Sequence, residues 1–343
     1  MKVMQVMLSR ANGGAELQFA DTVKALHRDG LDQIVLANPA SARYGELVRA
    51  GVKVLPVRAW GEWLAPLVRW QVGRIIRRER PDLVQCWMRR AANVVPRTGV
   101  PVIGWFGGYY DPDRFPSCDF FVGVTPGIVK HMVERGVAPD RAFYVNTYST
   151  ATETDPVRRG DLGTPAEASV LLTLSRLHPK KGLDVAIQAV ARIPGCHLWI
   201  AGDGPLQAEL EALAAGLGVT DRVRFLGWRT DRGALMRAAD LCLLPSRYEP
   251  FGTVIIEAWQ AGVPLVACEA AGPKETVRDG EDGLLVPIDD VDALEGAIRR
   301  VLGDRALRDR LVGTASRRYA AEFTLEVALA RLRAIYARIL DAA

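Results

Sequence analysis

The sequence predicts an α/β protein built from two doubly wound, Rossmann-like domains that face a central cleft. Three observations lead to this prediction: the length of 343 residues, a regular alternation of short apolar segments with amphipathic segments, and a polar stretch near the middle after which the alternation starts again. Single domains usually contain about 100–200 residues, so two domains are expected. Strands that alternate with helices along the chain indicate parallel sheets with helices on both faces.

The first domain is expected to span residues 1–155. Helices are predicted between its strands, for example after Gly13 and Gly14 and near 64–79. Segment 150–168 is polar, contains Pro and Gly and shows no apolar periodicity, so we interpret it as a linker. The apolar runs predict strands near residues 2–8, 33–37, 82–86, 101–105, 119–124 and 142–145.

The second domain is expected to span residues 168–323. Ligands of doubly wound sheets bind beyond the carboxyl ends of the strands, so two such sheets suggest a ligand cleft between them. The tail, 324–343, predicts a long amphipathic helix that packs back on the first domain, because its apolar residues recur at steps of three and four. Strands are predicted near residues 170–174, 197–201, 223–226, 241–244, 264–267 and 284–286.

The composition, with 49% hydrophobic and 24% charged residues, is ordinary for a globular protein of aqueous compartments. The first apolar run, Val3 to Leu8, is too short for a membrane span or a signal-peptide core. The cysteines form no CxxC pair and no Cys/His cluster, so neither a zinc site nor a disulfide framework is expected. A reducing cytoplasm fits this pattern. The cysteines are Cys86, Cys118, Cys196, Cys242 and Cys268.

The charge is distributed unevenly between the two expected domains. Residues 1–150 hold 20 Lys and Arg against 13 Asp and Glu, whereas the remainder holds 24 against 27. This balance suggests that the first domain meets an anionic partner, although such a charge is also common on soluble domains. A nucleic-acid partner is not expected, because the pI is only about 8.8 and no matching motif is present.

The stretch from Leu244 to Ala258 contains the strongest candidate site. A buried strand is expected to end at Ser246, and a helix to begin near Gly252 or Thr253, so the unpaired N–H groups of its first turn form an anion site. Glu249 stands in the loop and Glu257 on the helix. Two carboxylates at one phosphate would repel each other, so they suit hydroxyl groups of a ribose and of a sugar; taken alone, they would equally fit surface charges.

This stretch resembles the signature of the retaining glycosyltransferases of family 4, which have the two-lobed GT-B fold and carry two Glu residues eight positions apart. The resemblance covers nearly the whole second domain and, more weakly, the first. It implies a glycosyltransferase that uses a nucleotide sugar, with a UDP-sugar as the expected donor. Other segments match the family in order: residues 12–16, 175–182, 201–205, 225–228, 239–246 and 272–286.

The resemblance also implies the roles of individual residues. Arg176 and Lys181 would neutralise the departing β-phosphate in place of a metal ion, since preorganised cations at a developing charge are a large catalytic factor. Glu249 would hold the donor sugar during same-face attack, with a covalent role for Glu249 as the alternative. No metal is expected, because the Asp-x-Asp pair of Asp111 and Asp113 lies in the first domain, outside the donor motifs. No cofactor is expected, because the nucleotide sugar is a co-substrate. The expected donor-binding residues are Gly13, Gly14, Arg176, Lys181, Gly227, Trp228, Phe251, Gly252, Thr253 and Glu257, of which Glu257 would bind the ribose.

The first domain departs from the family. Many members carry a histidine after the strand that corresponds to residues 101–105, and this chain has none there. The run from Gly104 to Asp111 resembles a bacterial subgroup associated with lipopolysaccharide core or other cell-envelope glycans, which implies a glycan or glycolipid acceptor. Tyr109, Tyr110 and Asp111 either bind this acceptor or form an aromatic loop that packs on itself.

Segment 60–80 combines tryptophans with a cluster of arginines on a helical pattern. An interfacial helix on an anionic membrane has this composition, which would place the protein at the inner face of the cytoplasmic membrane. The alternative is an ordinary helix whose apolar residues, Leu67 among them, face the sheet.

Three other functions remain as alternatives. A nucleotide-sugar epimerase of the same fold would turn over the donor without an acceptor. A binding protein would retain the nucleotide sugar without transfer, and the presence of Glu249 argues against it. An NAD-dependent dehydrogenase is disfavoured because no Gly-x-Gly-x-x-Gly follows the first strand.

Overall fold

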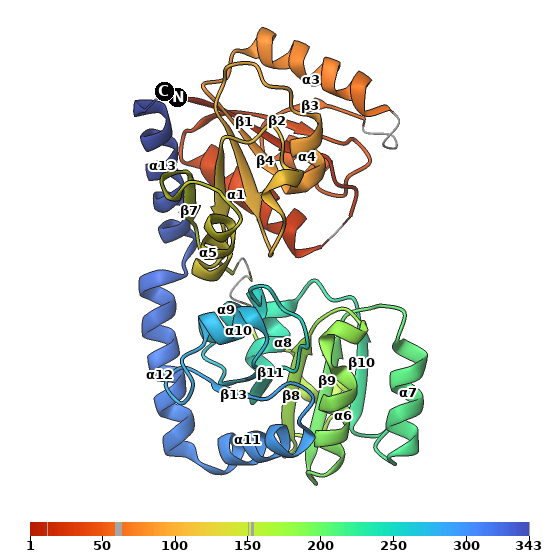
Figure 1. The fold of residues 1–343 in the computed structure, drawn as a ribbon. Helices are drawn as coiled ribbons and strands as arrows, with labels where there is room; N and C mark the ends of the chain where they lie inside the picture. Colours follow the sequence, from red (N-terminus) through yellow and green to blue (C-terminus); the bar gives the residue numbers. More distant parts are fainter. Residues whose placement is uncertain (12, 59–63, 150, 152–153, 343) are drawn as a thin grey trace. The chain divides into compact units, whose positions relative to one another are not determined.

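The computed structural model describes residues 1–11, 13–58, 64–149, 151 and 154–342 (Figure 1). The chain forms two compact units. Unit 1 comprises Met1–Tyr148 with Leu325–Ala343, and unit 2 comprises Ser149–Thr324. Each unit contains one parallel sheet with helices, which is the predicted fold class.

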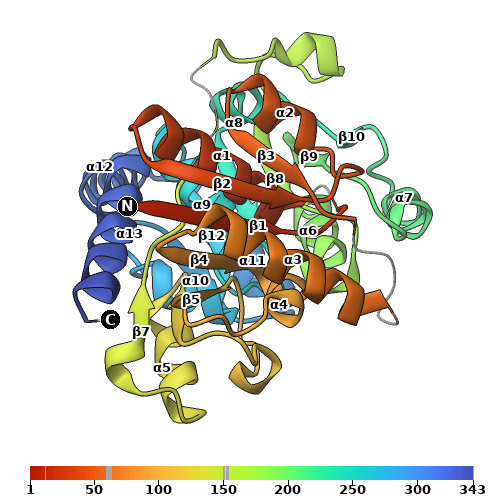
Figure 2. The ribbon, with the colours of Figure 1, turned by 90° about the horizontal axis from the view of Figure 1, so that it is seen from above.

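Unit 1 contains a seven-stranded sheet of order β3-β2-β1-β4-β5-β6-β7, in which every pair of neighbours is parallel. Most of this order can be followed in Figure 2. The sheet strands are β1 (Lys2–Met7), β2 (Asp32–Ala37), β3 (Lys53–Pro56), β4 (Leu83–Trp87), β5 (Val102–Phe106), β6 (Phe120–Gly123) and β7 (Ala142–Tyr144). The helices are α1 (Gly14–Arg28), α2 (Tyr44–Arg49), α3 (Ala65–Glu79), α4 (Met88–Val94) and α5 (Pro126–Glu134), with short 3₁₀ turns η2 (Pro112–Arg114) and η3 (Pro139–Arg141).

Strand β3 is absent from the sequence-based expectation. It is the edge strand of the sheet and pairs only with β2. Its four residues include an exposed Lys53 and an exposed Pro56, so the run holds only two apolar residues that a pattern could reveal. Proline is tolerated there because an edge strand needs fewer N–H donors.

Unit 2 contains a six-stranded parallel sheet of order β10-β9-β8-β11-β12-β13. Its strands are β8 (Ser169–Leu174), β9 (Cys196–Ala201), β10 (Val223–Gly227), β11 (Leu241–Leu244), β12 (Leu265–Cys268) and β13 (Leu284–Val286). Its helices are α6 (Leu183–Ala191), α7 (Gln207–Gly216), α8 (Arg232–Ala238), α9 (Thr253–Ala261), α10 (Ala271–Thr276), α11 (Val291–Gly303) and α12 (Arg305–Glu322), with 3₁₀ turns η4 (Arg159–Leu162) and η5 (Pro179–Lys181).

The segment interpreted as a linker belongs in large part to unit 2. Arg159 donates to the carbonyl oxygens of Ala238 and Ala168 at 3.0 and 2.9 Å and to Asp240 Oδ1 at 2.9 Å. Trp199 donates from its indole to the hydroxyl of Thr164 at 2.9 Å. This segment is therefore held on unit 2 by polar contacts. Because it needs few apolar residues for this packing, its sequence shows no apolar periodicity. Residues 150, 152 and 153 of this segment lie outside the described part of the chain.

The C-terminal helix α13 (Leu325–Asp341) packs on unit 1, where it contacts α1 (Figure 1). It buries Leu332, Ile335 and Ile339 on one face. A buried polar contact adds to this packing, because Gln5 Nε2 in β1 donates to the hydroxyl of Tyr336 at 3.2 Å.

All five cysteines are buried free thiols. Among the described residues, no helix is long and apolar enough to span a bilayer.

Candidate active site

The candidate site of unit 2 lies in the loops that follow β8, β9, β10 and β11. The carboxyl ends of parallel strands share one edge of the sheet, which is the edge where doubly wound sheets bind ligands. These loops are residues 175–182, 202–206, 228–231 and 245–252. They contain Arg176, Lys181 and Glu249, and Glu257 lies on α9, the helix that follows the last of them.

Two motif glycines allow neighbouring loops to approach closely. Gly182 has φ 61°, and a Cβ there would lie 2.0 Å from the carbonyl oxygen of Pro245. At Gly202, φ is 153° and a Cβ would lie 1.9 Å from the carbonyl oxygen of Ser175. Contacts this short exclude any side chain, so these glycines are required by packing within the protein.

Arg247 fixes the loop after β11 against the loop after β8. Its guanidinium donates to both carboxylate oxygens of Asp184 at 2.9 and 2.6 Å and to Asp289 Oδ1 at 2.6 Å. In addition, the amide of Tyr248 donates to the carbonyl oxygen of Lys180 at 3.1 Å. No sequence pattern marks Arg247 as a site residue, because its partners are distant along the chain.

Lys181 and Glu249 form an ion pair, with Nζ and Oε2 2.6 Å apart. Their side chains are 18% and 15% exposed, so both are largely removed from water. The sequence-based prediction gives them separate roles, one at the phosphate and one at the sugar. The structure brings them together at the carboxyl edge of the sheet.

Arg176 is exposed and makes no hydrogen bond or ion pair with any residue that the structure describes. Its loop is nevertheless fixed, because the amide of Leu177 donates to the carbonyl oxygen of Asp203 at 2.8 Å. The site therefore holds one cation that is paired internally, Lys181, and one that is available to an anion, Arg176.

Glu257 lies in the second turn of α9 and is only 3% exposed. Its Oε1 accepts from Nη1 of Arg232 at 2.5 Å, whereas Oε2 is buried and has no partner among the described atoms. Burial raises the pKa of the Glu257 carboxyl, and Arg232 opposes this shift. Because buried polar atoms are normally satisfied, Oε2 is suited to accept a hydrogen bond from a ligand hydroxyl.

The start of α9 is shaped by backbone geometry. Gly252 has φ 90° and precedes the helix, and Thr253, its first residue, is exposed. The amide of Gly272 donates to the carbonyl oxygen of Glu249 at 2.8 Å, so α10 fixes this loop. Phe251 is 5% exposed, which makes it part of the packing under the loop.

Gly227 and Trp228 lie at the end of β10, as expected. The carbonyl oxygen of Gly227 accepts from the amide of Gly202 at 2.8 Å, which ties the loops after β9 and β10 together. Trp228 is 47% exposed, so part of its surface is open to a ligand. Arg229 donates to both carboxylate oxygens of Asp231 at 2.8 and 2.6 Å.

In unit 1, Gly13 and Gly14 lie where β1 passes into α1. Glu16 accepts from the amide of Gly13 at 3.0 Å and so caps the helix. Neither glycine has a positive φ, and a Cβ at Gly14 would meet no atom within 4 Å. The fold of unit 1 therefore leaves open space at Gly14 and does not itself require a glycine there.

The loop after β5 contains Tyr109, Tyr110 and Asp111. Tyr110 packs on Phe115 with ring centroids 6.2 Å apart, and Asp111 Oδ1 accepts from the amide of Asp113 at 3.2 Å. His131 from α5 lies against this loop, with Nε2 3.1 Å from the carbonyl oxygen of Tyr110. The fold thus brings a histidine that is distant in sequence against this loop, where its ring also packs on Tyr109 with centroids 5.4 Å apart.

Helix α3 carries the described part of segment 60–80, whereas Trp60 and Trp63 lie outside the described residues. Val68, Val72 and Ile76 are buried against unit 1. The expectation that Leu67 also faces the sheet is wrong: Leu67 is 61% exposed, and Trp70, one turn further on, is 58% exposed. The apolar residues of α3 extend around more of the helix surface than the rest of unit 1 covers.

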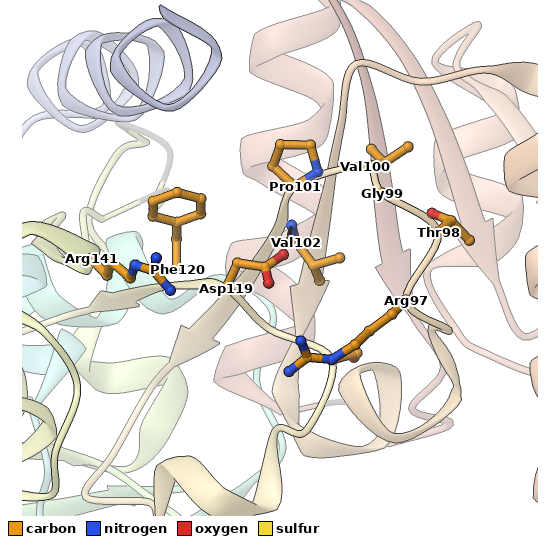
Figure 3. A pocket seen from close by; sticks show the side chains of 10 residues that line it. Arg97, Thr98, Gly99, Val100, Pro101, Val102, Asp119, Phe120 and Arg141 are labelled. Atoms are coloured by element: carbon orange, nitrogen blue, oxygen red, sulfur yellow. Dashed lines mark hydrogen bonds between the residues drawn. The ribbon is translucent and has the colours of Figure 1, made fainter. Parts of the chain in front are cut away.

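A pocket of about 340 Å³ lies at the opposite edge of the unit 1 sheet, before β5, β6 and β7 (Figure 3). Figure 3 shows Asp119 between Arg97 and Arg141. Asp119 accepts from the amide of Val102 at 3.0 Å, and Arg97 donates to the carbonyl oxygen of Pro116 at 3.0 Å. The pocket is remote from the carboxyl edge of that sheet.

Two doubly wound parallel sheets with these loops define a GT-B glycosyltransferase. Residues 12–147 match the model of "Glycosyltransferase Family 4", and residues 156–318 match that of "Glycosyl transferases group 1". The chain belongs to this family of glycosyltransferases and is an enzyme of that class.

Relatives and solved structures agree with this assignment. The chain is 34% identical to the lipopolysaccharide core biosynthesis glycosyltransferase LpsE of Rhizobium meliloti, over 92% of this chain and 93% of LpsE. It is 33% identical to LpsD of the same organism, over 94% of each chain. The crystal structure of Anabaena HepE in complex with UDP and glucose shares the fold, with a TM-score of 0.85 at 23% identity over 98% of this chain and 99% of HepE.

Proposed function

We propose that this enzyme is a metal-independent, retaining glycosyltransferase that moves a sugar from a UDP-sugar to a hydroxyl group of a lipopolysaccharide core or related cell-envelope glycan. The names of LpsE and LpsD support the acceptor class. The UDP bound to HepE supports the base of the donor. The proposed location is the inner face of the cytoplasmic membrane.

One observation carries the proposal for the donor site. A cation and a buried carboxylate oxygen, both without partners among the described residues, lie with a helix start around the same edge of the unit 2 sheet. Arg176 would bind the diphosphate together with the N–H groups of Thr253 and its neighbours at the start of α9. Glu257 Oε2 would accept from a ribose hydroxyl, and Trp228 would stack on the base.

The cations take the place of a metal ion in the proposed reaction. The bond between the anomeric carbon and the β-phosphate oxygen breaks, and its electron pair remains on UDP. Arg176 neutralises the charge that develops there. The acceptor hydroxyl attacks on the face that UDP leaves and transfers its proton to the departing phosphate oxygen, so the anomeric configuration is retained.

Glu249 holds the donor sugar in this proposal rather than attacking it. Its ion pair with Lys181 stabilises the carboxylate and so lowers its nucleophilicity. The alternative of a covalent glycosyl–enzyme requires Glu249 to leave Lys181 and bond to the anomeric carbon. Same-face attack needs no such rearrangement.

Unit 1 is proposed to hold the acceptor, with the Tyr109–Asp111 loop near it, whereas Gly13 and Gly14 stay predicted donor-binding residues. We also propose that α3 contacts an anionic membrane. Leu67 and Trp70 are exposed one turn apart, and the Arg74 guanidinium lies 5.7 Å from the centre of the Trp70 ring. Exposed apolar side chains flanked by arginines are typical of helices that lie in a membrane interface.

The experiment that tests the function combines a panel of nucleoside diphosphates with product analysis. UDP should raise the melting temperature most, and a UDP-sugar should release UDP in the presence of core oligosaccharide and EDTA. The new linkage, observed by NMR, should have the anomeric configuration of the donor. An inverted product would exclude retention, loss of activity in EDTA would exclude metal independence, and donor isomerised without acceptor would indicate an epimerase.

A further inference from the structure

The sheet of unit 1 has its topological switch point between β1 and β4. The chain builds the sheet from β1 through β2 to β3 on one side and from β4 to β7 on the other. The register pairs Val6 with Cys86, so the two strands end side by side at Met7 and Trp87. Doubly wound sheets bind their ligands at such a point, where the connections diverge (Figure 2).

A strained residue lies at this point. Strand β4 ends at Trp87, and α4 begins directly at Met88, which has φ 68°. A positive φ is unfavourable for residues that have a side chain, such as methionine. Backbone strain of this kind persists only where the surrounding structure enforces it, and it often occurs at functional sites. Trp87 is fixed by stacking on Trp105 with centroids 4.4 Å apart. The abrupt turn places Arg89 and Arg90 immediately beyond the strand.

Three arginines follow the two strands that meet at the switch point. Arg89 and Arg90 follow β4, and Arg10 follows β1 three residues after its end. All three are exposed, and within the described chain none has a hydrogen bond or an ion pair. We call Arg10, Arg89 and Arg90 the switch-point arginines.

The carboxylates of two neighbouring segments accept from backbone amides. Glu16, at the start of α1, accepts from the amide of Gly13, and Asp111, just before the 3₁₀ turn that packs on α4, accepts from the amide of Asp113. Neither carboxylate forms an ion pair with a switch-point arginine in the described chain, so the positive charge of these arginines stays available. It also accounts for part of the excess of 20 basic over 13 acidic residues in positions 1–150.

We propose that the switch-point arginines bind an anionic group, a phosphate or a sugar carboxylate, on the acceptor and so select acidic acceptors over neutral ones. The proposal rests on the proposed function, in which unit 1 holds the acceptor. Guanidinium groups bind phosphate and carboxylate in the same bidentate manner. The donor diphosphate has its own cation in unit 2, Arg176, so the arginines of unit 1 are assigned to the acceptor.

The test compares the parent enzyme with Arg89→Ala/Arg90→Ala. Alanine is a good helix former, so exposed positions of α4 tolerate it. The probes are a core oligosaccharide in its native form, the same oligosaccharide after removal of phosphate, and the same oligosaccharide after reduction of its carboxyl groups. Calorimetry measures binding of each probe, and initial rates with a UDP-sugar give KM values. The matched control is Arg97→Ala/Arg141→Ala, which removes the same charge at the opposite edge of the sheet.

The double variant should bind the native oligosaccharide about 10–100-fold more weakly, as expected for loss of charge-assisted hydrogen bonds. Its affinity for UDP and the behaviour of the control should stay near those of the parent. Arg89→Lys/Arg90→Lys should give an intermediate loss. If the difference between variant and parent disappears with the dephosphorylated oligosaccharide, the bound group is phosphate. If it disappears with the carboxyl-reduced oligosaccharide, the bound group is carboxylate.

The proposal is overturned if the parent does not bind the native oligosaccharide, if both treated forms bind like the native one, or if the loss falls on UDP instead. An equal loss in the control would also overturn it, because the effect would then be general charge. Failure of the proposed function looks different: the parent would bind the native oligosaccharide through these arginines and yet transfer no sugar to it.

Discussion

Arg232 Nη1 donates to Glu257 Oε1 at 2.5 Å, from the first residue of α8 to the second turn of α9. The carboxylate is 3% exposed, and a buried charge of this kind requires a partner. One oxygen is thus held by Arg232, and the other is left for a ligand. The pair links α8, which follows β10, to α9, which follows β11, and two predictions depend on it.

Arg232→Ala should shift the pH dependence of nucleotide binding to higher pH. Removing the guanidinium takes away the effect that opposes the burial-raised pKa of Glu257, so this pKa should rise further. The protonated carboxyl is a weaker acceptor for the ribose, so UDP affinity should fall below this pKa and recover above it, and the fall should begin at a higher pH in the variant than in the parent. The thiol of Cys242 on β11 is the other titratable group that interacts with this carboxyl, and burial keeps it protonated. Calorimetric titration with UDP measures the profile, and a pH-independent loss would contradict the prediction.

Glu257→Gln should stabilise the protein while weakening UDP binding. Because burial raises the pKa of Glu257, the folded protein retains this proton to a higher pH than the unfolded chain, where the pKa is about 4.3. The residue's contribution to stability is present below that value and is lost as pH rises through the folded pKa. Glutamine does not ionise and so avoids this loss. The melting temperature of Glu257→Gln should therefore exceed that of the parent, and the difference should be larger at neutral pH than at acidic pH. UDP affinity should fall about tenfold, since a charged acceptor is replaced by a neutral one.

Arg176→Ala should reduce catalysis with little effect on folding. Arg176 is exposed and unpaired within the described structure, so its removal breaks no internal contact. Loss of one group that stabilises transition-state charge lowers kcat by about 100–1000-fold. Rates of UDP release with a UDP-sugar and acceptor measure this. Arg305→Ala on α12, whose side chain is 86% exposed, is the control and should have the parent's rate; a similar rate for Arg176→Ala would remove this residue from the site.

Gly182→Ala should destabilise unit 2 and impair donor binding. The new Cβ would lie 2.0 Å from the carbonyl oxygen of Pro245, and the backbone has φ 61°, so the loops after β8 and β11 must separate. Strain of this size costs about 2 kcal/mol or more. Gly296→Ala in α11 is the control: no atom lies within 4 Å of its Cβ, and alanine should stabilise the helix by about 0.5–1 kcal/mol. In thermal unfolding with and without UDP, the melting temperature should fall for Gly182→Ala and rise for Gly296→Ala.

Leu67→Ser/Trp70→Ser should release the protein from anionic vesicles. Both side chains are exposed on α3 and pack on no core, so the fold should be retained. The parent should float with vesicles that contain anionic lipid and much less with neutral vesicles, because membrane binding adds electrostatic attraction to apolar burial. Equal flotation of the parent with both vesicle types would contradict a role for the arginines of α3 in membrane binding. The control Leu217→Ser removes another exposed leucine, in unit 2, and should leave flotation unchanged.

Local pattern predicts most of the secondary structure of this protein. Strands such as Ser169–Leu174 and Leu241–Leu244 are continuous apolar runs because they are buried on both faces of a parallel sheet. The edge strand Lys53–Pro56 lacks such a run, so its pattern is too short to detect. The segment from 154 to 168 looks like a linker because its polar side chains, Arg159 among them, are satisfied by partners that no local pattern reveals.

The sequence by itself determined the α/β class, the positions of Arg176, Lys181 and Glu249 in loops that follow strands and the position of Glu257 on the next helix, because apolar periodicity and glycine-rich turns are local properties. Only the tertiary structure decided which of these groups are paired: Lys181 with Glu249, and Glu257 with Arg232, which lies 25 residues away. Pairing depends on which loops the strand order places at one edge of the sheet, and strand order is set by contacts between residues distant in sequence. For the same reason the switch point between β1 and β4, with arginines on both sides, could be recognised only after the sheet was assembled.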